Sequence, residues 1–172
     1  TPTVLGAIYG LVTTICNLAV GYGALAANTN TLAENTAVGI CALCSNTTGA
    51  GNTAIGKAAL CANLIGSRNT AVGVCAMCNT TASDNVGVGD GALFINSAGA
   101  CNIAIGPSTL RANTTGVSNL AIGYQALSCN SSGICNVGIG HQAILCNTFG
   151  NANTALGYQA LMCNSIGCYN VA

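Results

Sequence analysis

The sequence predicts an all-β protein, a parallel β-solenoid (a β-helix or β-roll) with about 17 residues per coil and roughly ten coils. Three observations predict this fold. A nine-residue phrase recurs almost unchanged, as NTAIGKAAL at 52–60, NTAVGVCAM at 69–77 and NTALGYQAL at 153–161. Successive copies are spaced by close to 17 residues, and each copy has asparagines and aliphatic residues at fixed places. Such a period is too short for a pair of helices, but it suits short strands joined by tight turns.

Each copy begins with an asparagine that stands four residues before a glycine. We expect this first asparagine to lie in a turn, where its side-chain amide bonds backbone groups of its own and the next coil. Stacked coils then form an asparagine ladder. The first asparagines are Asn17, Asn35, Asn52, Asn69, Asn85, Asn102, Asn119, Asn136 and Asn153, and Asn170 opens a further copy. The glycines are Gly21, Gly39, Gly56, Gly73, Gly89, Gly106, Gly123, Gly140 and Gly157.

The residues between the first asparagine and the glycine are expected to form a strand. An aliphatic residue directly precedes each glycine, which predicts that this position faces inward. Strand alternation then places Thr36, Thr53, Val86, Ile103, Leu120 and Val137 on the same inward side. Small residues such as Ala54 and Gly87 would face outward and make that face smooth.

After the glycine, the pattern predicts a second apolar column and a second ladder. The column stands four residues after the glycine: Leu25, Leu43, Leu60, Met77, Leu93, Leu110, Leu127, Ile144 and Leu161. The second asparagines are Asn28, Asn46, Asn63, Asn79, Asn96, Asn113, Asn130, Asn147 and Asn164. In seven copies a glycine follows three residues later, where we expect a turn that needs positive φ.

The repeat divides the chain into a degenerate first coil or interface segment at 1–16 and a solenoid domain at 17–172. The apolar stretch 5–27 already carries the repeat and contains Thr13, Thr14 and Asn17, so we expect no membrane span. Neither end carries an evident polar cap, because the chain starts with TPTVLGAIYGLV and stops within a copy. We therefore expect self-association, as a head-to-tail filament or a lateral trimer.

Charge is almost absent. The chain has three basic and three acidic residues and a formal net charge of zero. Nucleic acids and anionic membrane surfaces are poor candidate partners. A chain with so few basic residues would gain little binding affinity by neutralising their phosphates. A net charge near zero also removes the repulsion that keeps molecules apart.

The twelve cysteines stand in columns and in short pairs. The columns are Cys44, Cys61 and Cys78, and Cys129, Cys146 and Cys163. Candidate disulfides within one coil join Cys129 to Cys135 and Cys163 to Cys168. Two CxxC pairs, Cys41 with Cys44 and Cys75 with Cys78, suggest zinc, but the pairs lie two coils apart, about 10 Å by strand spacing. We therefore predict disulfides or buried thiols, and no metal or other cofactor.

Four second asparagines also start N-glycosylation sequons: Asn46, Asn79, Asn113 and Asn130. Modification needs these side chains to face outward, whereas a ladder needs them inside. We favour the ladder.

No arrangement for catalysis is predicted. The single histidine, His141, occupies a variable surface slot that is filled by Tyr124 and Tyr158 in the neighbouring copies. The acidic residues form no pair suited to acid–base hydrolysis. We expect Tyr124, His141 and Tyr158 to form one stacked column and Gln125, Gln142 and Gln159 to form another.

The motif N-T-A-[VI]-G-x-x-A-L followed by N-T-T-G resembles the repeats of phage tail fibres, large-virus surface proteins and trimeric autotransporter adhesin heads. The resemblance covers nearly the whole chain, although the adhesin heads have a shorter period. It implies a structural module of an extracellular, cell-surface or virion-surface fibre, with no catalytic residue. The alternatives are an ice-binding solenoid, an adhesive module that binds a receptor or glycan, and a hexapeptide-repeat acyltransferase. The period disfavours the acyltransferase, and the interrupted threonine column disfavours ice binding.

Overall fold

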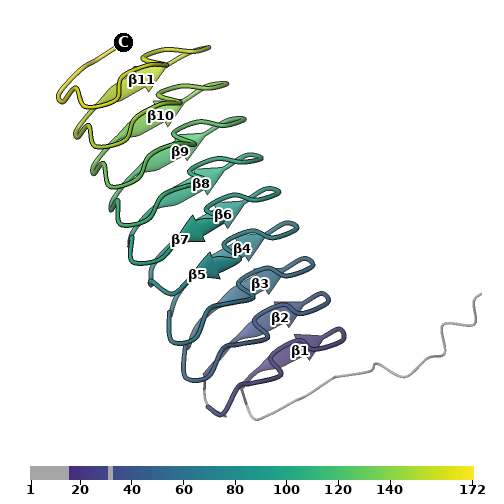
Figure 1. Ribbon diagram of the computed structural model, residues 1–172. Coiled ribbons are helices and arrows are strands. Elements are labelled where there is room, and N and C mark those ends of the chain that lie inside the picture. Colours follow the sequence, from purple (N-terminus) through teal and green to yellow (C-terminus); the bar gives the residue numbers. More distant parts are fainter. Residues whose placement is uncertain (1–15, 31–32) are drawn as a thin grey trace, which may run out of the picture.

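The computed structural model describes residues 16–30 and 33–172, which form one stack of strands and turns and contain no helix. The stack is a parallel β-solenoid of about eight turns with strands about 17 residues apart, as predicted (Figure 1). Within the described residues the number of coils is slightly lower than the roughly ten expected. Nine equivalent strands bound eight complete coils, and a bridge between Thr154 and Val171 continues the stack beyond the last strand. The predicted first coil at 1–16 lies outside the described residues, except for Cys16.

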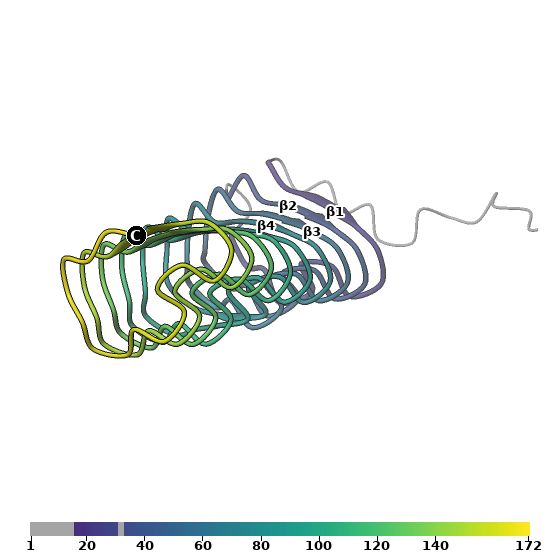
Figure 2. The ribbon, with the colours of Figure 1, turned by 90° about the horizontal axis from the view of Figure 1, so that it is seen from above.

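One sheet runs along the whole stack, and its strands all pair parallel and in register. For example, Ala37 pairs with Ala54, and Ala54 pairs with Ala71. The strands are β1 (Leu18–Val20), β2 (Thr36–Val38), β3 (Thr53–Ile55), β4 (Thr70–Val72), β6 (Val86–Val88), β8 (Ile103–Ile105), β9 (Leu120–Ile122), β10 (Val137–Ile139) and β11 (Thr154–Leu156). A short second sheet pairs β5 (Asn79–Thr80) with β7 (Ile95–Asn96). Seen from above, the coils follow one another as similar outlines (Figure 2).

The predicted direction of the strand side chains is wrong. The central residue of each strand faces inward, and the two flanking residues face outward. In β9, Ala121 is fully buried, whereas Leu120 and Ile122 are half-buried. A coil of 17 residues encloses little space, and that space already holds a leucine column and two asparagine columns. Only alanine or glycine fits at the central position of each strand. The bulkier residues on either side of it therefore point outward.

The core consists of three thin columns. The aliphatic column four residues after each glycine is buried over most of its length, as predicted, and includes Leu43, Leu60 and Met77. The strand alanines form the second column, and the alanines just before the leucines form the third. Each coil therefore contributes one large apolar side chain and relies on polar groups for the rest of its interior.

Left-handed backbone closes each coil. The buried leucine position has φ near +50° throughout, for example 49° at Leu43 and 51° at Leu60. The strand-ending glycine also has positive φ, 137° at Gly39, and a Cβ there would lie 2.5 Å from the carbonyl oxygen of Gly56. The later glycines, such as Gly116, do not have positive φ, which contradicts our expectation. A Cβ at Gly116 would instead collide with Asn113 Oδ1 and with the Gly133 carbonyl, so close packing explains the glycine.

Candidate functional site

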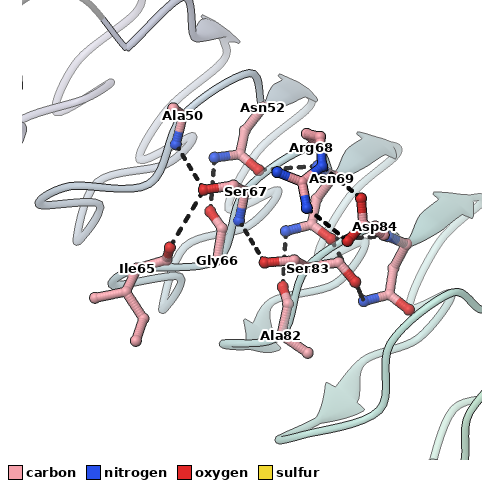
Figure 3. Close-up of polar contacts among 11 residues, drawn as sticks. Ala50, Asn52, Ile65, Gly66, Ser67, Arg68, Asn69, Ala82, Ser83 and Asp84 are labelled. Carbon is pink, nitrogen blue, oxygen red and sulfur yellow. Dashed lines mark hydrogen bonds and ion pairs between the residues drawn. The ribbon is translucent and has the colours of Figure 1, made fainter.

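The first ladder is confirmed. The amide of each first asparagine is buried between two coils and bonds the backbone of both. Asn52 Oδ1 accepts a hydrogen bond from the backbone N–H of Asn69 at 3.0 Å, and Asn52 Nδ2 donates to the Gly66 carbonyl at 2.8 Å (Figure 3). The same two contacts recur at other members, with small changes of acceptor. The ladder contains Asn35, Asn52, Asn69, Asn85, Asn102, Asn119, Asn136 and Asn153.

The second ladder is confirmed over part of its length. Amide-to-amide bonds join Asn46 to Asn63 and link Asn96, Asn113, Asn130 and Asn147 in succession, and they end at Asn147 Oδ1, which is buried without a hydrogen-bond partner. Asn113 Nδ2 donates to Asn96 Oδ1 at 2.9 Å and to the Gly116 carbonyl at 2.9 Å, which closes its own turn and joins two coils. Its buried or half-buried members are Asn46, Asn63, Asn96, Asn113, Asn130, Asn147 and Asn164.

Asn79 is not a member of this ladder, which corrects the prediction. The coil between Gly73 and Gly89 is one residue shorter than its neighbours, so Thr80 takes the inward position and Asn79 is exposed. Threonine has no amide to continue the ladder. As a result, the Asn63 Oδ1 and Thr80 Oγ1 atoms are buried without a hydrogen-bond partner.

The sequons therefore differ in accessibility. Asn46, Asn113 and Asn130 are fully buried ladder members and are inaccessible to modification in the folded rod. This burial favours the ladder over glycosylation at those three residues. Asn79 alone among the four is exposed, so the glycosylation reading stays open there.

The outer face of the long sheet is regular along the whole stack. Two side-chain columns run along it, one from the first and one from the last residue of each strand. The first column is Leu18, Thr36, Thr53, Thr70, Val86, Ile103, Leu120, Val137 and Thr154. The second column is Val20, Val38, Ile55, Val72, Val88, Ile105, Ile122, Ile139 and Leu156. We call these two columns the sheet face. It carries no charged residue and is apolar or methyl-bearing along its length.

The cysteines form contacts between coils rather than bonds within a coil. All twelve are free thiols, so neither Cys129 with Cys135 nor Cys163 with Cys168 is bonded, and the CxxC pairs are also reduced. The Cys44 and Cys61 sulfurs lie 3.2 Å apart on successive coils. Burial, followed by the nearby Cys129 and Cys163, raises the pKa of Cys146 in the other column. Among the described residues, no three metal-ligating side chains gather in a group that could hold an ion.

The predicted surface columns near the C-terminal end are confirmed. The His141 ring lies 5.2 Å from the rings of both Tyr124 and Tyr158, measured between centroids. Gln142 Nε2 donates to Gln125 Oε1 at 2.9 Å, and Gln159 Nε2 donates to Gln142 Oε1 at 2.9 Å. His141 thus continues an exposed stacked column, and no carboxylate contact to its ring is seen among the described residues.

Two of the charged residues form an ion pair at the surface. Arg68 donates two hydrogen bonds to the Asp84 carboxylate, at 2.6 and 2.8 Å, from one coil to the next (Figure 3). This hydrogen bonding lowers the pKa of Asp84 and raises that of Arg68. Arg111 lies over the Phe94 ring, 5.3 Å from its centroid. Both side chains of the ion pair are exposed, so its contribution to stability is small.

No known protein family, characterised protein or solved structure matches this chain. Within the described part of the chain, no helix has the length and apolar character needed to cross a membrane.

Proposed function

We propose that this chain is a self-associating structural module of a fibre or filament, in which copies pack through the sheet face. The observation that carries the proposal is the sheet face itself, two uncharged columns that extend over all nine strands of the sheet. On this proposal the chain is not an enzyme, and its repeats serve to build a stiff, regular surface.

The size of the sheet face supports a stable contact. Nine strands spaced by about 4.8 Å give a face roughly 40 Å long. Its side chains range from half-buried to well exposed, such as Ile55 at 42% and Leu156 at 70%. A standard interface buries about 800 Å² on each partner, and an uncharged face that runs the length of the rod is suited to such a contact.

The chemistry of the sheet face favours a second copy of the same chain as the partner. The face has no charge to attract a charged partner, and the net charge of zero leaves little repulsion between copies. Two such faces are regular, so they can pack with the sheets about 10 Å apart, as in β-sandwiches. This lateral contact leaves the ends of each rod free to join head to tail.

We place this module outside the cell, on a cell surface or on a virion surface. The support is its richness in cysteine, which is typical of chains that mature in oxidising surroundings.

The test is sedimentation of the full chain at micromolar concentration. We expect the wild type to sediment as an assembly, and a double variant of the face, Ile105→Lys with Ile122→Lys, to sediment as a folded monomer. Ile40→Lys with Val74→Lys is the matched control, because both residues are exposed but lie outside the sheet face. A monomeric wild type, or equal behaviour of the two double variants, would contradict the proposal. Electron microscopy then separates lateral pairs or trimers from head-to-tail filaments.

A second candidate is ice binding, and one observation favours it. Thr36, Thr53 and Thr70 lie in register on the outer side of the sheet, and ice binding needs an outward array of threonines of this kind. Bulky aliphatic side chains replace threonine in most later coils, so we rank this function second. Thermal hysteresis of millimolar protein tests it, and the absence of hysteresis removes it.

A further inference from the structure

Three thiols stack on three successive coils, each five residues after the strand-ending glycine. These are Cys44, Cys61 and Cys78, all half-buried. The backbone holds them in register, because Ser45 N–H donates to the Cys61 carbonyl at 3.1 Å and Ala62 N–H donates to the Cys78 carbonyl at 2.8 Å. The stacking is therefore a property of the coil and not of mobile side chains.

The first two thiols are already in contact. Their sulfurs lie 3.2 Å apart, and the Cys44 sulfur also lies 3.5 Å from the Cys61 carbonyl oxygen. Stacked coils place equivalent Cα atoms about 4.8 Å apart, within the roughly 4.4–6.8 Å range of disulfides. A bond would need the sulfurs to approach by only about 1.2 Å, which side-chain rotation can supply.

We propose that Cys44 and Cys61 form a disulfide that staples two successive coils along the rod axis. The oxidant is a low-molecular-weight disulfide such as oxidised glutathione. This inference does not rest on the proposed function. It also differs from the pairs expected within a single coil, because the partners belong to different coils.

The reaction balances as two thiol–disulfide exchanges. The Cys44 thiolate attacks one sulfur of oxidised glutathione, forms a mixed disulfide and releases the first glutathione. The Cys61 thiolate then attacks the Cys44 sulfur and releases the second. Two protein thiols are oxidised by two electrons, one glutathione disulfide is reduced to two thiols, and two protons pass from the cysteines to glutathione.

The environment of Cys61 sets the rate of the second step. Burial, followed by its hydrogen bond with Cys44, raises the pKa of the Cys61 thiol to about 12. Little thiolate is present at neutral pH, so stapling is slow there and becomes faster as the pH rises.

The chain offers a direct readout. Trypsin cleaves after Lys57, Arg68 and Arg111, so the peptide 58–68 contains Cys61 and no other cysteine. Cys44 lies in the peptide 1–57, and Cys78 lies in the peptide 69–111. The peptide linked to 58–68 shows on which side of Cys61 the partner lies, and fragmentation of the linked pair distinguishes Cys44 from Cys16 and Cys41 within 1–57.

The experiment oxidises the reduced full chain with oxidised glutathione, blocks remaining thiols with an alkylating agent, denatures the protein and maps its tryptic peptides. We expect 58–68 joined to 1–57, with a mass lower by two hydrogen atoms than the sum of the free peptides. The joined species should be lost in Cys44→Ala and retained in the matched control Cys41→Ala. Linkage of 58–68 to 69–111, or recovery of alkylated 58–68 alone, would overturn the proposal. If Cys44→Ala does not fold, fragmentation of the linked wild-type peptides decides the outcome, because it locates the bond at Cys44 or at another cysteine of 1–57.

Discussion

Asparagine carries much of this fold because its side chain has the same donor and acceptor as a peptide group. Backbone groups at a sharp turn lack a hydrogen-bond partner in the sheet, and the side-chain amide of each first asparagine supplies one. Asn102 Nδ2, for example, donates to the Gly116 carbonyl at 2.8 Å. Such groups are buried in the rod, where each unmade hydrogen bond is unfavourable by about 1–3 kcal/mol. The identity of the residue therefore matters most where the chain turns.

We predict that a single substitution can repair the break in the second ladder at Thr80. Thr80→Asn restores an amide opposite the unpaired Asn63 Oδ1, so we expect the free energy of unfolding to rise by about 1–2 kcal/mol. Urea unfolding followed by circular dichroism measures the change. Thr48→Asn, at an exposed position, is the control and should leave stability within about 0.5 kcal/mol. Destabilisation by Thr80→Asn would show that the shorter coil cannot hold the ladder amide.

The element that matters is the three-residue strand, whose central side chain packs inside and whose flanking side chains form the sheet face. Ala121 pairs in register with Ala104 and Gly138 on the neighbouring strands. This column of small residues lets the sheet approach the buried leucines. The strand thus reverses the usual expectation that its largest side chains face the core.

We predict opposite outcomes for neighbouring substitutions in β9. Ala121→Leu adds a bulky side chain where the interior has no space for it. It should lower the free energy of unfolding by about 1–3 kcal/mol. Ile122→Thr alters an outward, half-buried residue and should change it by less than about 1 kcal/mol. Thermal melts of the two variants under identical conditions compare them. A larger loss for Ile122→Thr would restore the rejected inward assignment.

The whole molecule is quasi-one-dimensional, since each coil contacts only the coils above and below it in the stack. Stability then accumulates through nearest-neighbour interfaces: the sheet, the two ladders and the leucine column. Ion pairs contribute little, because the described surface has a single salt bridge, between Arg68 and Asp84. The length of such a rod is limited only by the number of coils.

Deletion of one whole coil tests this architecture. Removing 103–119 joins Asn102 to Leu120, which takes the place of Ile103 in the register. We expect a folded rod with the same circular dichroism spectrum, shorter by about 4.8 Å and melting at a slightly lower temperature. Removing 103–110 alone breaks every column and should unfold the neighbouring coils. Equal loss of structure in both deletions would argue against independent coils.

The sequence by itself determined the period, both ladders over most of their length, the buried leucine column and the stacked Tyr–His–Tyr and Gln columns. These features follow from spacing alone, because in-register coils bring residues about 17 positions apart into contact. Only the tertiary structure decided which strand face lies inside, that Thr80 replaces Asn79 in the second ladder, and that none of the cysteine pairs within a coil is bonded. Alternation along a strand gives two possible phases, and the choice depends on the narrow interior that remains once the coil has closed. A one-residue deletion in a turn can likewise be placed on either side of an asparagine, and only packing selects the residue that points inward.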